Sequence, residues 1–289
     1  MDYEKEKGEN FLIKRDKEVK VIKYAPNGDV EIQDIKWNKN GFRSIERLNR
    51  KEYMVVSTGE VKEYQFREEK GENGLRRSMK KLNQILKNNF AGAGNELFIT
   101  LTAEKDVTDF LEMKAKFQQW WRKMKREYKD LEFVAILEKH TERDSWHIHT
   151  MVKAIEHKRL YIPNNKIEKI WGYGFTKTSR ITSTPTANDI KEDYKMAYKD
   201  KITEKFGIDK VINYMCKSKT KEQIPICERC YYKSKGIKMP IPQKIRYDET
   251  RQQMGQEYKL KKQYTSLIRD AKTNGVVNKV KTEIWTKKQ

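Results

Sequence analysis

The sequence predicts an α+β fold, and two kinds of pattern support that prediction. Short apolar runs rich in β-branched and aromatic residues, bounded by glycines or polar turns, are typical of strands. Longer segments whose apolar residues recur at i, i+3, i+4 and i+7 are typical of amphipathic helices. Both patterns recur between residues 74 and 242 of this 289-residue chain, which is long enough to bury a sizeable core.

A helix, a strand and a second helix are expected first in this region. Residues 74–90 have an apolar face opposite a basic one, formed by Leu75, Met79, Leu82 and Leu86 against Arg76, Lys80, Lys81 and Lys87. After the breaker sequence AGAG, the run ELFITLTAE at residues 96–104 predicts a buried strand. Residues 108–131 then predict a long helix, with Thr108 or Asp109 as its N-cap.

A β-hairpin is expected next, because EFVAILE at residues 132–138 and WHIHTMVKA at residues 146–154 are strand-like runs separated by a polar turn. Residues 164–174 predict a short helix ended by glycine, and residues 175–182 predict a further strand. The segment DKVINYMCKSK, residues 209–219, predicts a last helix in this region.

The chain divides into three regions on these patterns. Residues 1–73 form an N-terminal extension of uncertain fold, with strand-like runs such as DVEIQDIKW and EYMVVSTGEV. Residues 74–242 form the main domain, and residues 243–289 form a basic C-terminal segment with one helical stretch and a final strand-like run, KVKTEIW.

The charge balance indicates a polyanionic partner. Lysine and arginine number 63 against 42 aspartates and glutamates, which gives a net charge of +21, and nucleic acid is the commonest partner of such a protein. The sequence has no apolar run of about 18 residues, and its first ten residues are charged where a signal peptide would turn apolar. A cytoplasmic protein without a membrane span is therefore expected.

Three cysteines argue against a disulfide framework, because the number is odd. Cys227 and Cys230, in the sequence CERC, could begin a zinc site. A tetrahedral structural site needs four ligands, and neither a second CxxC nor a nearby HxxxH supplies the other two. Reduced thiols in or beside a strand are the alternative.

The most informative stretch is SWHIHTMV, which contains two of the four histidines. On a strand, His147 and His149 point to the same face, and Glu138 lies across the turn on the antiparallel neighbour. A carboxylate and two imidazoles suit a divalent ion that polarises a phosphate, with Mg²⁺ or Mn²⁺ expected. The simpler alternative is a pair of exposed strand histidines and a surface glutamate.

A second group of interest lies in the helix predicted over residues 209–219. Its apolar face would carry Val211, Ile212, Met215 and Cys216, and its polar face Lys210, Tyr214, Lys217 and Lys221. Tyr214 would then face outward among lysines. A phenol has an ordinary pKa of about 10, but a neighbouring ammonium and a metal-polarised phosphate would let it attack phosphorus. An ordinary exposed helix tyrosine is the alternative.

Three segments in this order, LFITLTAE, LEKHTERDSWHIHTMV and INYMCK, resemble the motifs of the HUH endonuclease superfamily. The resemblance is specifically to the single-tyrosine rolling-circle replication initiator (Rep) proteins of plasmids and single-stranded DNA phages. It covers roughly residues 75–242 and includes YYKSKGIKMP, which is similar to a segment that follows the tyrosine helix in those proteins. It implies a central antiparallel β-sheet, RRM-like in layout, with helices packed on one face.

The resemblance also implies a chemistry and its residues. His147, His149 and Glu138 would be the metal ligands, Tyr214 the nucleophile and Lys217 its partner, while Thr100 and Thr102 lie on the strand of the first motif. Tyr214 would nick single-stranded DNA at an origin, keep the 5′-phosphate as a phosphotyrosine and leave a 3′-hydroxyl. Host helicase and polymerase would then be further partners.

Two departures from the family pattern bear on this assignment. The turn reads RDSWH where relatives often have a glycine before the histidine pair. No second tyrosine lies four residues from Tyr214, which favours the single-tyrosine class and implies that termination needs another subunit or another molecule.

Two other functions remain open on the sequence. A relaxase or a single-tyrosine transposase would use the same chemistry, and a non-catalytic origin DNA-binding protein would need only the charge and the aromatic residues. The remaining histidines, His140 and His157, are expected to be ordinary polar residues, although His140 shares the strand parity of Glu138 and is an outside candidate for a ligand.

Overall fold

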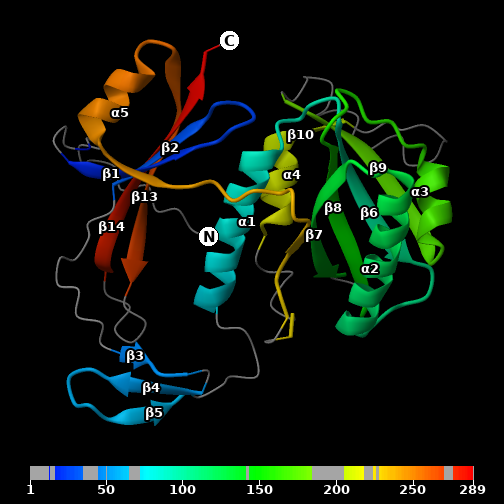
Figure 1. The fold of residues 1–289 in the computed structure, drawn as a ribbon, viewed down its shortest axis with the longest axis horizontal. Coiled ribbons are helices and arrows are strands. Elements are labelled where there is room, and N and C mark those ends of the chain that lie inside the picture. Colours follow the sequence, from blue (N-terminus) through cyan, green and yellow to red (C-terminus); the bar gives the residue numbers. More distant parts are fainter. Residues whose placement is uncertain are drawn as a thin grey trace. The chain divides into compact units, whose positions relative to one another are not determined.

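A computed structural model describes residues 13, 17–34, 45–49, 51–64, 72–140, 143–183, 205–217, 224–225, 228–269 and 276–288. The chain forms two compact units, which are described separately. One comprises residues 1–23, 27–67 and 241–289, and the other comprises residues 24–26 and 68–240. The α+β prediction is confirmed, because both units combine largely antiparallel sheets with helices (Figure 1).

A six-stranded sheet forms the centre of the larger unit, in the order β10-β9-β6-β8-β7-β11. Its neighbours pair antiparallel, except that the edge strand β10 runs parallel to β9. The predicted hairpin is therefore confirmed as β7 and β8, next to the first-motif strand β6. The strands are β6 (Glu96–Ala103), β7 (Leu131–Lys139), β8 (Trp146–Ala154), β9 (Gly174–Thr182), β10 (Lys205–Gly207) and β11 (Tyr232–Lys233).

Helices cover both faces of this sheet, so the expectation of helices on one face is wrong. The helices α2 (Phe110–Glu127) and α3 (Asn164–Trp171) lie on one side, and α1 (Glu72–Asn89) and α4 (Ile208–Met215) lie on the other (Figure 1). Central strands such as β6 and β8 are apolar on both faces, as in buried sheets, and the two helical layers cover that surface.

Local sequence explains where these helices begin and end. Asp109 is the N-cap of α2, and its carboxylate accepts hydrogen bonds from the backbone N–H groups of Leu111 and Glu112. Gly172 ends α3 in the left-handed conformation, with φ of 67°, which a residue without Cβ adopts at no steric cost. The apolar face predicted for α1 is buried, namely Leu75, Met79, Leu82 and Leu86.

The last helix of the larger unit is shorter than the sequence predicts. α4 ends at Met215, with Cys216 as its C-cap, and the backbone N–H of Lys217 donates to the carbonyl of Tyr214 in a tight final turn. Val211, Ile212 and Met215 are buried as expected. Lys217 therefore lies just beyond the helix rather than on its polar face, and Lys221 lies outside the described residues.

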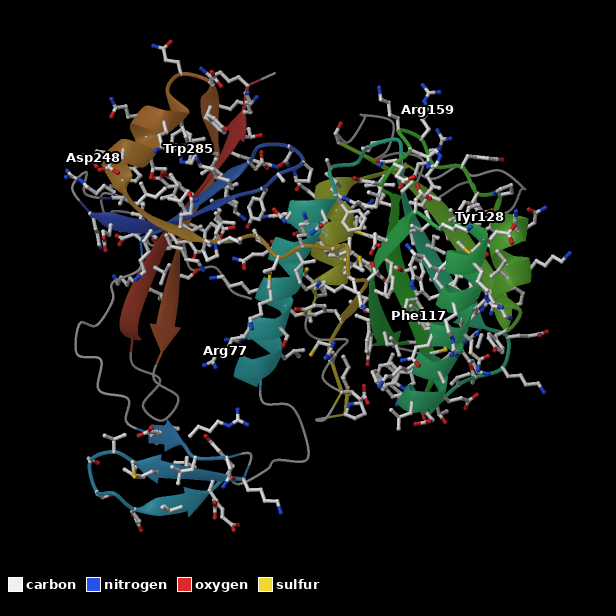
Figure 2. The ribbon with its side chains drawn as sticks, viewed as in Figure 1. Arg77, Phe117, Tyr128, Arg159, Asp248 and Trp285 are labelled. Atoms are coloured by element: carbon white, nitrogen blue, oxygen red, sulfur yellow. The ribbon has the colours of Figure 1, made fainter. Side chains whose placement is uncertain are left out.

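The smaller unit contains two sheets. The five-stranded antiparallel sheet, β12-β1-β2-β14-β13, combines strands from the N-terminal and C-terminal segments of the chain. Trp285 lies beside α5 (Tyr247–Met254) (Figure 2), and the Arg251 guanidinium stacks over its ring at 3.8 Å. The strands are β1 (Glu18–Lys23), β2 (Val30–Asp34), β12 (Gln243–Arg246), β13 (Tyr258–Arg269) and β14 (Val276–Lys287).

The second sheet of this unit is a three-stranded antiparallel meander in the order β3-β4-β5. Its strands are β3 (Ile45–Arg47), β4 (Glu52–Val55) and β5 (Val61–Glu63).

Two further expectations concern cysteines and membranes. Cys230 is a buried, reduced thiol, whereas Cys227 lies outside the described residues, so the CERC pair cannot be followed as a unit. Within the described parts of the chain, no helix combines the length and the apolar composition that crossing a bilayer requires.

Candidate functional site

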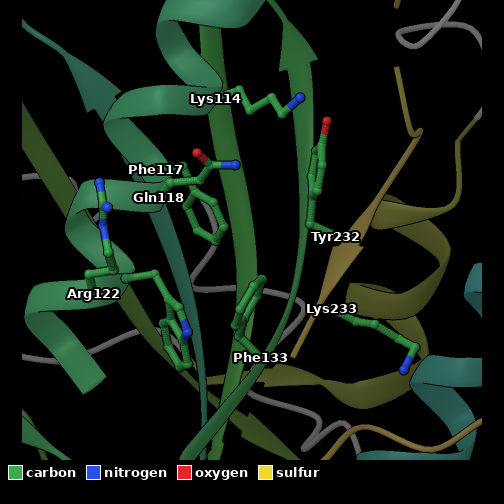
Figure 3. Close-up of a pocket in the computed structure, with 8 residues that line it drawn as sticks. Lys114, Phe117, Gln118, Arg122, Phe133, Tyr232 and Lys233 are labelled. Carbon is green, nitrogen blue, oxygen red and sulfur yellow. The ribbon is translucent and has the colours of Figure 1, made fainter. Parts of the chain in front are cut away.

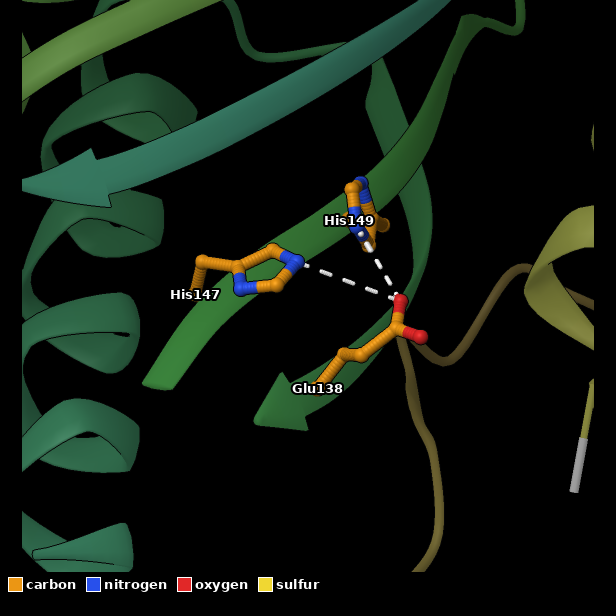
Figure 4. A group of neighbouring side chains, drawn as sticks. All are labelled: Glu138, His147 and His149. Carbon is orange, nitrogen blue, oxygen red and sulfur yellow. Dashed lines mark ion pairs between the residues drawn. The ribbon is translucent and has the colours of Figure 1, made fainter. Parts of the chain in front are cut away.

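The β7–β8 hairpin brings one carboxylate and two imidazoles to the same face of the sheet. In the strand register, Glu138 pairs directly with His147, and His149 follows two residues later on the same side of β8. Figure 4 shows the three side chains converging, with the Glu138 carboxylate between the two rings. Their potential ligand atoms all lie within 4.8 Å of one another.

This cluster is largely withdrawn from solvent. Glu138 is 4% exposed and His149 is 5% exposed. Oε2 of Glu138 lies 3.2 Å from Nε2 of His149 and 3.9 Å from Nε2 of His147. A buried carboxylate is costly without a positive charge beside it, and either a protonated imidazole or a bound cation supplies that charge.

The neighbouring strand β6 orients His149 through two residues that share its face. Oγ1 of Thr100 lies 3.1 Å from Nδ1 of His149, directly across the β6–β8 ladder. When Nδ1 carries the proton and donates to Thr100, Nε2 presents its lone pair towards Glu138. The ring of Phe98 stacks on His149, with a centroid distance of 5.6 Å and an interplanar angle of 11°.

The contribution of Phe98 is not apparent from the sequence alone, although one signal points to it. Phe98 precedes Thr100 by two residues, so both side chains lie on the same face of the strand. A large apolar residue on that face narrows the positions that the His149 ring can adopt.

The chemistry of the donor set fits a divalent cation. Imidazole nitrogen and carboxylate oxygen together suit several first-row ions as well as Mg²⁺. The three groups come from two adjacent rigid strands, and the second-layer contact from Thr100 fixes the ring nitrogen that faces the cluster. Glu138, His147 and His149 could therefore hold one metal ion.

Tyr214 points towards this cluster, so the expectation that it faces outward among lysines is wrong. Its phenol oxygen lies 3.0 Å from Nε2 of His149, and its ring packs edge-on against those of His149 and Phe98. Burial, together with the nearby Glu138 carboxylate, raises the pKa of Tyr214 to about 12. The phenol is therefore neutral at pH 7, and a cation at the cluster would oppose the effect of the carboxylate.

Lys217 lies beside Tyr214 despite being outside the helix. Its ammonium nitrogen is 5.6 Å from the centroid of the tyrosine ring. The tight turn after Met215 places the side chain there, whereas the sequence argument relied on a helical i, i+3 pair. The proximity is as expected, and its structural cause is different.

The other two histidines lie outside this group of ligand atoms. The exposed ring of His140 is 5.9 Å from that of His147, but His140 is not part of the cluster found among the described residues. His157 bonds through Nδ1 to Asp130 at 2.7 Å, and this hydrogen bond raises the pKa of His157. The Cα register places neither residue opposite Glu138.

The fold and this cluster define a recognisable class. An antiparallel sheet that carries a buried carboxylate–histidine–histidine group is compatible with a metal-dependent nuclease. A comparison with known families agrees with that class: the family model described as replication-associated protein ORF2 matches residues 96–223. The match supports a role in replication initiation, and with it an interaction with DNA.

The matched segment begins at β6 and extends beyond α4, so it contains Thr100, the hairpin cluster, Tyr214 and Lys217. Comparison with curated proteins finds no match, and comparison with solved structures finds none either.

Proposed function

We propose that the protein is a rolling-circle replication initiator that nicks and rejoins single-stranded DNA at an origin through a 5′-phosphotyrosine intermediate. The observation that carries this proposal is the 3.0 Å distance between the Tyr214 phenol and His149, a member of the buried cluster. A nucleophile that close to a cation site can share one phosphate with it.

Each residue of the site has a role in this proposal. Glu138, His147 and His149 would hold the cation, with Mg²⁺ or Mn²⁺ the expected ions. When bound, the cation would polarise the scissile phosphate and stabilise the charge that develops on its oxygens. Thr100 and Phe98 keep the His149 ring in one orientation, which preserves the position of the phosphate relative to Tyr214.

The proposed reaction exchanges one phosphodiester bond for another. The phenol oxygen of Tyr214 forms a bond to phosphorus as it loses its proton, and the bond from phosphorus to the 3′-oxygen breaks. Lys217 is positioned to protonate that leaving oxygen, so no net proton is consumed. Attack of a 3′-hydroxyl on the phosphotyrosine reverses these steps and rejoins the strand.

The partners in this proposal follow from the product. A free 3′-hydroxyl is a primer for a host polymerase, and unwinding of the duplex ahead of it would need a host helicase. The net charge of +21 favours both the single-stranded substrate and origin DNA. Such an initiator would act in the cytoplasm of its host.

The decisive experiment is a search for a covalent protein–DNA adduct. The full chain is incubated with single-stranded oligonucleotides and Mn²⁺ or Mg²⁺, and the attached peptide is identified by mass spectrometry. An adduct on Tyr214 that requires the metal is the expected result. A protein that binds these oligonucleotides but never cleaves them would instead be a non-catalytic origin-binding protein.

A further inference from the structure

A groove with an aromatic floor lies between α2 and the strands β7 and β11 of the larger unit (Figure 3). Its volume is about 320 Å³, and its lining comes from both the helix and the sheet. Phe133, which lines it, is an odd number of residues from Glu138 on β7, so the two side chains point to opposite faces. The groove is therefore on the other side of the sheet from the metal-ligand cluster.

Aromatic rings from three elements form the floor and one wall of this groove. The half-buried ring of Trp121, on α2, contacts Phe133, on β7, with a centroid distance of 4.4 Å. Tyr232, on the edge strand β11, adds a third ring that is also half-buried. Flat apolar surfaces of this kind suit the face of a nucleobase, which every base presents irrespective of its sequence.

A polar row runs along the helix beside these rings. Lys114, Gln118 and Arg122 recur at i, i+4 and i+8, so they lie on one line of the α2 surface, as Figure 3 shows. The spacing of eight residues separates the two cationic residues by about 12 Å along the helix axis. Gln118 lies between them and offers one acceptor and two donors.

The two ends of the row differ in charge. At one end, Glu228 accepts hydrogen bonds from the Lys114 ammonium at 2.7 Å and from the Tyr232 hydroxyl at 2.8 Å. That carboxylate offsets the charge of Lys114 and leaves a polar, nearly neutral end. At the other end, the exposed side chain of Arg122 lines the groove as a cation and can bind a phosphate through two parallel N–H groups.

We propose that this groove is a second binding site for single-stranded nucleic acid, separate from the site of cleavage. One base stacks over the Trp121 and Phe133 rings, Gln118 hydrogen-bonds to the edge of that base, and the adjoining phosphate binds Arg122. The net charge of +21 favours a polyanion over an acidic or neutral peptide at this end of the groove. The proposal requires no catalysis, so it stands apart from the nicking reaction.

Photo-cross-linking tests this site directly. The full chain carrying Tyr214→Phe, without divalent metal, is mixed with a single-stranded oligonucleotide that contains 5-iododeoxyuridine and is then irradiated. These conditions suppress any attachment through the proposed nucleophile. Mass spectrometry is expected to find cross-linked peptides that contain Trp121, Phe133 or Tyr232. Cross-links confined to other parts of the chain would overturn the proposal.

A pair of variants on one helix separates the groove from general charge effects. Arg122→Gln and Lys123→Gln remove the same charge from exposed neighbouring positions, but only Arg122 lines the groove. Arg122→Gln is expected to lower the groove cross-link at least several-fold, whereas Lys123→Gln leaves it nearly unchanged. Equal yields from the two variants would contradict the assignment of the phosphate to Arg122.

The role of the base is tested with strands that lack bases. The wild-type chain should bind a base-containing oligonucleotide more tightly than an abasic strand of equal length, and Gln118→Ala and Trp121→Ala should reduce that difference. Loss of one base-stacking contact corresponds to a change of about 5- to 100-fold. Gln118 is exposed, so its variant keeps the test valid if Trp121→Ala fails to fold. A preference that neither variant alters would exclude the groove as the base site.

Discussion

The phenol oxygen of Tyr214 and Nε2 of His149 lie 3.0 Å apart, although the two residues are separated by 65 positions in the chain. The helix α4 and the strand β8 carry them, and the ring of Phe98 contacts both. This relationship connects the proposed nucleophile to the proposed metal site. The predictions below vary one part of it at a time.

Replacing the tyrosine should separate covalent attachment from binding. Tyr214→Phe removes the attacking oxygen and retains the ring that packs against His149 and Phe98. Metal binding and DNA binding should persist, and no adduct should form with Mn²⁺. Tyr232→Phe is the matched control, because it also removes a half-buried hydroxyl and should leave the adduct unchanged. An adduct that survives Tyr214→Phe, or that maps to Tyr231, Tyr232 or Tyr198, would contradict the assignment.

Removing either cluster histidine should abolish metal binding. His147→Ala and His149→Ala each delete one of the three proposed ligands, and isothermal titration with Mn²⁺ should detect no site in either protein. Both should keep most of their affinity for single-stranded DNA, because phosphate contacts elsewhere supply it. His157→Ala serves as the control, since that histidine pairs with Asp130 away from the cluster. Cleavage at the wild-type rate by both cluster variants, with metal present, would rule out this site.

The second-layer contact should matter for metal affinity. Thr100→Val keeps the shape of the side chain and removes the hydroxyl that bonds Nδ1 of His149. Loss of a partner of this kind typically weakens metal binding about 10- to 100-fold, and the same titration measures it. Thr102→Val is the control on the same face of β6, opposite His147, and should have a smaller effect. Equal affinities for wild type and Thr100→Val would show that Thr100 does not orient the ligand.

The lysine should affect the rate without moving the adduct. Lys217→Ala removes the ammonium 5.6 Å from the Tyr214 ring and leaves the nucleophile in place. Single-turnover cleavage should slow by about 10²- to 10⁴-fold, the range for general acid–base catalysis, while peptide mapping still identifies Tyr214. Lys210→Ala, on the exposed side of the same helix, should cleave at nearly the wild-type rate. If the two lysine variants behave alike, Lys217 has no special role.

Binding of single-stranded DNA should depend steeply on salt. With 63 basic and 42 acidic residues, the chain is expected to neutralise several phosphates and to release their counterions. The slope of log K against log salt should be about −0.7 for each neutralised phosphate. Fluorescence anisotropy with a labelled oligonucleotide measures this slope, and a flat response between low and physiological salt would argue against a polyanion as the partner.

Most elements of the larger unit follow from sequence patterns because their periodicity and their end signals are local. The strand over residues 146–154 agrees residue for residue with β8, and Asp109 and Gly172 end their helices as cap chemistry requires. The alternation of a strand also places His147 and His149 on one face, and the hairpin places Glu138 opposite His147. These relationships depend on residues close together in the chain.

Contacts between distant segments could not be derived in this way. The direction of Tyr214 depends on how α4 packs against the sheet, and a helical repeat alone places it on a polar face. Helices on both faces of the sheet and the shared sheet of the two chain ends likewise depend on long-range pairing. Local pattern therefore specified the metal-ligand hairpin, whereas the meeting of Tyr214, His149 and Phe98 arose from burial of apolar surface between elements, which no short segment encodes.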